Sequence, residues 1–133
     1  MNSLRLWIIL GWVFLPTVMF GGYSLLRLIN RGNVLTPFQV NWFRAGHAHA
    51  GVLLVMSVVY YLCLDATPLA AGVKHLACGI LVVGILAQSG GFFIHMIVGK
   101  PDQASVGNTV TAVGAGLLTA AVAILVYGLS IMP

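Results

Sequence analysis

The sequence predicts an all-α integral membrane protein, a bundle of four transmembrane helices. Of its 133 residues, 60% are hydrophobic and 6% are charged, whereas a soluble domain is about 25% charged. The mean hydropathy is +1.05. Four apolar stretches are each long enough to cross a ~30 Å hydrocarbon core as a helix. We therefore expect a single four-span domain that covers residues 1–133.

The four expected spans lie at about 6–28, 42–64, 76–98 and 106–131. The first is too long for the apolar core of a cleaved signal peptide, and we interpret it as a true span. Only helices and closed barrels satisfy the backbone in lipid, and the stretches lack the alternation of barrel strands. Turn-forming segments separate the spans. Because these connections are short, successive helices are expected to be antiparallel neighbours.

The fourth span has no ionisable side chain, and we interpret it as scaffold. It carries Ala112, Gly116 and Ala120 at a spacing of four. Small residues at this spacing allow another helix to approach closely.

The charges are few and belong to the membrane edges. The formal net charge of +4 is spread over the connections without a basic run, which indicates contact with a lipid bilayer and no nucleic-acid binding. The first and third connections together carry more Lys and Arg than the opposite side. A positive-inside count therefore places the first connection in the cytoplasm.

Three of the four histidines are expected near one membrane face. His47 and His49 lie early in the second span, and His95 lies near the end of the third. If these two helices are antiparallel, the start of the second span and the end of the third lie at the same depth in the membrane. His75 lies at the start of the third span, near the other face, and we interpret it as an interfacial residue. Polar groups inside a membrane are costly, so each of the three is a site candidate.

Helix geometry separates His47 from His49. Residues two positions apart point about 200° apart on an α-helix, so a regular helix cannot direct both rings at one small metal ion. Either each ring serves its own site, or one alone is a ligand. Small residues flank both rings, among them Gly46 and Gly51, and they leave the room that a haem needs. Arg44, one turn away, could pair with haem propionates.

Gly84, Gln88, Gly91 and His95 form one stripe on the third span. Small residues with polar neighbours on one helix face indicate a cavity wall or a tight helix contact. The alternative for every histidine is structural, because small residues pack membrane helices and histidines hydrogen-bond across them.

The first two expected spans resemble those of the catalytic subunit of the heme-copper oxidases. The first ends in Gly-Gly-Tyr-Ser-Leu-Leu-Arg-Leu at 21–28, followed by a loop with Pro37 and Asn41. The second reads Ala-His-Ala-Gly-Val-Leu-Leu-Val-Met at 48–56. By this resemblance His49 is an axial ligand of a low-spin haem. The family has one histidine here, whereas this chain has two.

The resemblance also implies an assembly. The family's subunit has twelve spans in three four-helix units, so a homotrimer of this chain would resemble one oxidase core. His47 of one protomer and His49 of the next would then clamp a haem b through bis-histidine ligation of its iron, with His95 lining the site. The family orientation places both termini in the cytoplasm, against the positive-inside count, and implies a bacterial-type inner membrane.

The resemblance does not extend to the residues with which the family reduces oxygen. The family's copper ligands and its crosslinked tyrosine have no counterpart here, and we interpret Tyr60 and Tyr61 as interfacial aromatics. A haem b protein of this kind would transfer electrons or bind a small gas. The sequence identifies no redox partner.

Two other functions fit the sequence. One is a copper or small-solute transporter with a path along His47 or His49, His95, Met96 and Gln88, because imidazole and thioether ligands suit copper. The other is a non-catalytic helper subunit of a larger oxidase complex, with the small-residue stripe of the fourth span against its partner.

Overall fold

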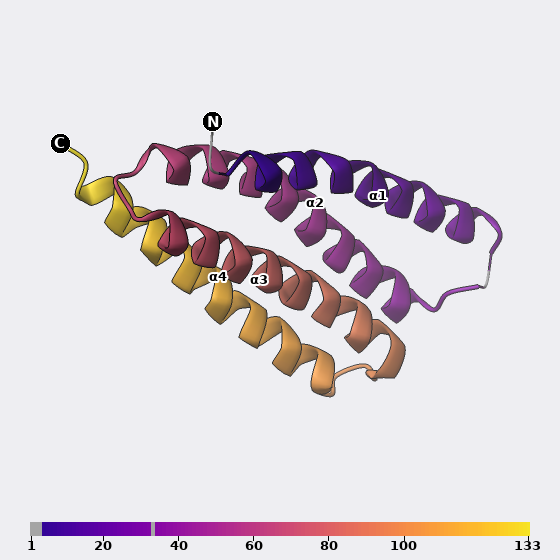
Figure 1. Ribbon diagram of the computed structural model, residues 1–133. Coiled ribbons are helices and arrows are strands. Elements are labelled where there is room, and N and C mark those ends of the chain that lie inside the picture. The colour runs from indigo at the N-terminus through magenta and orange to yellow at the C-terminus, as the bar shows by residue number, and fades with distance from the viewer. Residues whose placement is uncertain (1–3, 33) are drawn as a thin grey trace.

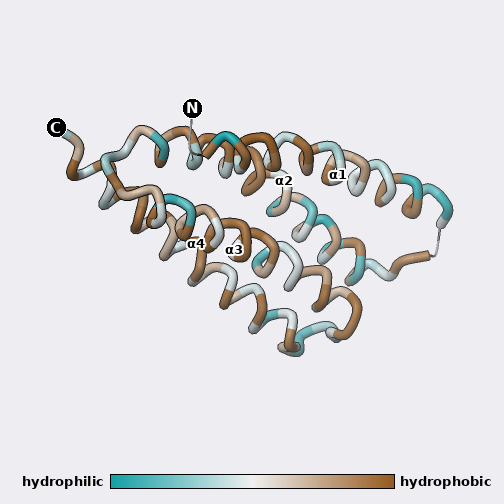
Figure 2. Tube along the Cα trace, in the orientation of Figure 1, coloured by the Kyte–Doolittle hydropathy of each residue, from teal (hydrophilic) through white to brown (hydrophobic). Residues whose placement is uncertain are grey.

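The computed structural model describes residues 4–32 and 34–133, and every regular element in this part of the chain is a helix. The four helices are α1 (Arg5–Asn30), α2 (Pro37–Ala66), α3 (Ala71–Val98) and α4 (Val106–Ser130). Each is long and apolar enough to cross a membrane, which confirms the expected four-span architecture. Figure 1 shows the helices running up and down in chain order, and Figure 2 shows hydrophobic residues along all four.

Two helices begin earlier than the apolar spans suggested. α2 starts at Pro37 because Thr36 caps it: the Thr36 hydroxyl accepts the backbone N–H of Gln39 at 3.2 Å, and the Gln39 side chain accepts the backbone N–H of Thr36 at 3.0 Å. Proline is favoured at the first helical position. The Thr-Pro pair thus starts the helix instead of only breaking the chain, and α3 likewise begins at Ala71.

The helices pack mainly on their neighbours in the sequence: α1 on α2, α2 on α3, and, most extensively, α3 on α4. The core lies where α2, α3 and α4 meet. It includes Tyr60 and Tyr61, which are 6% and 2% exposed, and the Tyr60 hydroxyl donates to the Ala121 carbonyl at 2.8 Å. The expectation that these tyrosines are interfacial aromatics is wrong: both rings fill the core.

A row of small residues lies on the face of α4 that packs against the rest of the bundle. Its members are buried and recur every seven positions: Gly107, Gly114, Ala121 and Gly128. A Cβ atom added to Gly114 would overlap the backbone nitrogen of Gln88, and one added to Gly91 would overlap the Thr111 hydroxyl. The stripe on the third span is therefore a tight helix contact and not a cavity wall.

The other stripe of α4 stays open. Ala112, Gly116 and Ala120 are exposed, and a Cβ added to Gly116 would meet nothing within 4 Å. Within this chain, α4 instead approaches another helix closely at Gly107 and Gly114.

These two glycine environments predict opposite effects of one substitution. Alanine is favoured over glycine in a helix by about 1 kcal/mol, and nothing opposes this gain in Gly116→Ala. In Gly114→Ala the new methyl group must separate α4 from α3. We expect Gly114→Ala to lower the thermal unfolding midpoint in detergent and Gly116→Ala to leave it unchanged or raise it. Equal midpoints would contradict this assignment of the α3–α4 contact.

Candidate functional site

The histidines gather at two ends of the bundle, as the antiparallel arrangement requires. At one end, the His49 ring lies 4.6 Å from that of Phe92, and the His95 ring lies 4.1 Å from that of Trp42. At the other end, the Trp7 indole N–H donates to His75 Nδ1 at 3.0 Å.

His47 and His49 face different neighbours on the two sides of α2. The ring of His47 lies over Gly21 and Gly22 of α1, where Cβ atoms would fall 3.5 Å from Nδ1 and 2.8 Å from Nε2, respectively. The ring of His49 lies beside Phe92 of α3. The two rings therefore contact different helices, as expected for residues two positions apart on an α-helix.

His49 has the hydrogen bonding of a metal ligand. Its Nδ1 lies 2.8 Å from the carbonyl oxygen of Ala45, one turn earlier on α2. A carbonyl oxygen only accepts, so the bond requires the proton on Nδ1 and leaves Nε2 with a free lone pair. No described residue hydrogen-bonds to Nε2. Iron-ligating histidines are commonly oriented by such a bond from the other ring nitrogen.

His47 borders an open apolar groove of about 530 Å³ between α1 and α2. Ala48 and Gly51 form part of its floor, and Val18 and Met19 line it from α1. Ala48 and Gly51 leave this part of the groove without bulky side chains. Because Nε2 points at Gly22, however, coordination in the groove requires the imidazole to turn away from α1.

Gly46 and His95 contribute to packing at this end. A Cβ on Gly46 would lie 3.0 Å from the ring of Phe93, so α3 already occupies the space beside this glycine. His95 is 3% exposed, and its Nδ1 lies 2.7 Å from the hydroxyl of Ser105, the N-cap of α4. The Ser-Val-Gly-Asn sequence at 105–108 is a capping signal that marks Ser105 as the start of the helix.

Arg44 is exposed on α2, one turn before His47. Arg44 forms no ion pair with any of the described residues, 4–32 and 34–133. A guanidinium at this position is available to an anionic group at the membrane edge. In the same described ranges, no three His, Cys, Asp or Glu side chains lie together as a small metal ion would require.

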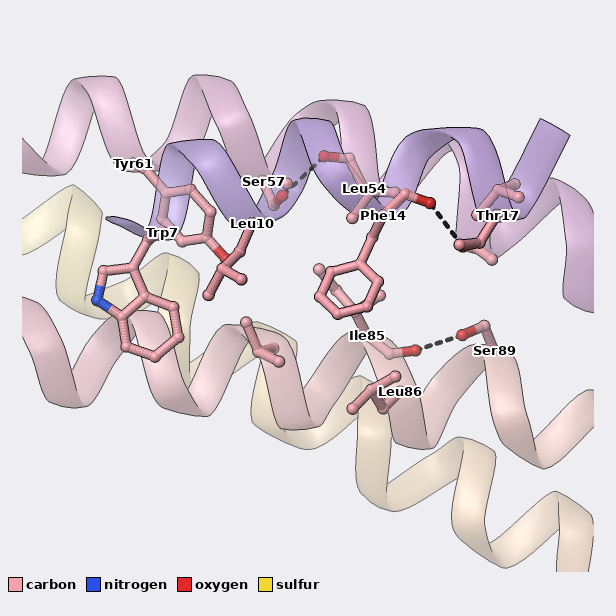
Figure 3. A pocket seen from close by; sticks show the side chains of 14 residues that line it. Trp7, Leu10, Phe14, Thr17, Leu54, Ser57, Tyr61, Ile85, Leu86 and Ser89 are labelled. Carbon is pink, nitrogen blue, oxygen red and sulfur yellow. Dashed lines mark hydrogen bonds between the residues drawn. The ribbon is translucent and has the colours of Figure 1, made fainter. Parts of the chain in front are cut away.

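A separate cavity of about 260 Å³ lies between α1, α2 and α3 (Figure 3), and no histidine lines it. Its floor is Ala50, Leu54, Ser57 and Tyr61 of α2. This cavity was not predicted from the sequence, although small and polar residues recur along that face of the second span.

The bond between His95 and Ser105 predicts a stability effect. Ser105→Ala removes both the N-cap of α4 and the partner of a buried imidazole, whereas Ser130→Ala removes one exposed hydroxyl bonded to its own helix. Losing a cap costs about 1 kcal/mol. We expect Ser105→Ala to unfold at a lower temperature than Ser130→Ala in the same detergent. The reverse order would contradict the role given to Ser105.

No family model, curated protein or solved structure matches this chain. The function of the chain is therefore inferred from its own side chains. The described residues offer one oriented imidazole at His49, a second at His47 beside an open groove, and an exposed guanidinium at Arg44.

Proposed function

We propose that this chain is a membrane haem b-binding protein that transfers electrons or binds a small gas, with His49 as an axial ligand. The observation that carries the proposal is the bond between His49 Nδ1 and the Ala45 carbonyl. It leaves Nε2 unprotonated with a lone pair, and a neutral imidazole nitrogen is a common axial ligand of haem iron.

Bis-histidine ligation needs a second imidazole, and the geometry of one chain does not supply it to the same iron. His47 faces α1, His95 is held by Ser105, and His75 lies at the other end of the bundle. We therefore propose that a second copy completes the site, so that His47 of one protomer and His49 of the next hold the haem between them. A homotrimer would repeat this arrangement with one haem per chain.

Arg44 and Gly51 support this placement. Arg44 is exposed near both histidines, toward the start of α2, where its guanidinium could bind propionates. Gly51 keeps the groove beside His47 free of a side chain. When bound, haem b supplies a one-electron redox centre. The two imidazoles would fill both axial positions, which favours electron transfer over gas binding.

The proposal is tested by absorption spectroscopy of protein purified after haem-replete expression. We expect the wild-type chain to show a Soret band with about one haem b per chain and no shift with carbon monoxide. His49→Ala should lose the bound haem, and His47→Ala should lose it or gain a carbon monoxide shift. His75→Ala is the matched control and should retain the wild-type spectrum.

A wild-type protein without a Soret band would refute haem binding. An unchanged spectrum in His49→Ala would refute the assigned ligand. Haem bound by a monomer with a wild-type spectrum would refute completion of the site by a second copy.

The open face of α4 favours one further candidate, a helper subunit that packs against a larger membrane protein. Ala112, Gly116 and Ala120 are exposed on α4, and small residues at this spacing allow close helix contact in membranes. Mild-detergent purification distinguishes the candidates. A helper subunit should copurify with one large partner, and Gly116→Leu should release it, whereas the haem protein should purify as copies of itself.

A further inference from the structure

We propose that the cavity between α1, α2 and α3 holds one acyl chain of a membrane phospholipid, from the leaflet at the Trp7 end of the bundle. This inference is independent of haem. It follows from the chemistry of the cavity wall, its dimensions and the polar groups at its rim.

The wall is apolar even where hydroxyl groups line it (Figure 3). The hydroxyl of Thr17 donates to the Phe14 carbonyl at 2.6 Å, and that of Ser57 donates to the Leu54 carbonyl at 2.7 Å. Ser89 donates to a carbonyl of its own helix in the same way. These three hydroxyl protons are thus used within their own helices. The Tyr61 hydroxyl is a further polar group in a lining that is otherwise mostly hydrocarbon, so the cavity offers few hydrogen bonds to water.

The cavity opens sideways between α1 and α3. Phe14 of α1 and Leu86 of α3 both line it, yet they are 52% and 66% exposed. Both belong to membrane-spanning helices, so the opening faces the hydrocarbon of the bilayer and a lipid chain can enter without crossing a polar layer.

The dimensions fit one hydrocarbon chain. The lining residues Trp7 and Val18 are eleven positions apart on α1, which is about 16 Å of helix, or about half of a ~30 Å hydrocarbon core. Even all of the space there that protein atoms leave unfilled, about 820 Å³, gives a cross-section of about 50 Å² over that length, below the ~80 Å² of a helix about 10 Å across. A helix from a second copy is therefore too wide.

The rim at the Trp7 end offers donors to a phosphate. His75 Nδ1 accepts from the Trp7 indole, so a neutral ring carries its proton on Nε2, and His75 is exposed. Arg5 is exposed at the same end of α1, although its position two residues before Trp7 places it on another side of the helix. An imidazole N–H and a guanidinium suit a phosphodiester and favour a phospholipid over an uncharged apolar molecule.

Native mass spectrometry of the detergent-purified protein tests the proposal. We expect wild-type chains to retain one phospholipid each. Ser57→Leu fills the middle of the cavity from α2 and should reduce the retained fraction at least fivefold. Val82→Phe narrows it independently from α3 and should have the same effect. Ala115→Leu, on the exposed surface of α4, is the matched control and should retain the lipid.

Three outcomes would overturn the proposal. The wild-type chain could retain no lipid, it could retain a lipid without phosphate, or a cavity variant with wild-type helicity could retain as much phospholipid as Ala115→Leu. The haem spectrum of the same samples keeps the two proposals separate, since a lipid-free variant that keeps its Soret band affects only this one.

Discussion

The contact between α3 and α4 is the constraint on which the rest of the structure depends. Lipid tails are as apolar as the helix surfaces, so membrane helices associate through close packing and not through burial from water. Gly107 and Gly114 bring α4 against the backbone of α3. This contact fixes the position of α3, which supplies Phe92 to the histidine end and one wall of the cavity at the other.

The sequence was sufficient for those features that depend on one helix at a time. Hydropathy predicted four spans, and the 100° step between residues predicted that His47 and His49 face different sides of α2. Features that depend on the pairing of two helices were not predictable in this way. Two stripes of small residues run along α4, and hydropathy does not say which one meets α3, because both are equally apolar.

The same limit applies to the candidate site. From the sequence alone, Gly46 was expected to leave room beside the histidines for a haem. In the structure, Phe92 and Phe93 fill the space beside Gly46, and they belong to a helix more than forty residues away. The Ser105 partner of His95 lies across the connection to α4. The partner of His49 is local, because the Ala45 carbonyl that binds its ring lies one turn earlier on the same helix. Partners on the same helix can be deduced from the spacing of residues in the sequence. Partners on another helix depend on how the two helices pack, which that spacing does not determine.

The hydrogen bond between Trp7 and His75 ties the beginning of α1 to the beginning of α3. The indole N–H can only donate, so the bond makes Nδ1 of His75 the acceptor and leaves the proton of a neutral ring on Nε2. Elsewhere α1 packs mainly on α2. One side-chain bond therefore gives the N-terminal end of the first helix a second anchor besides its neighbour in the sequence.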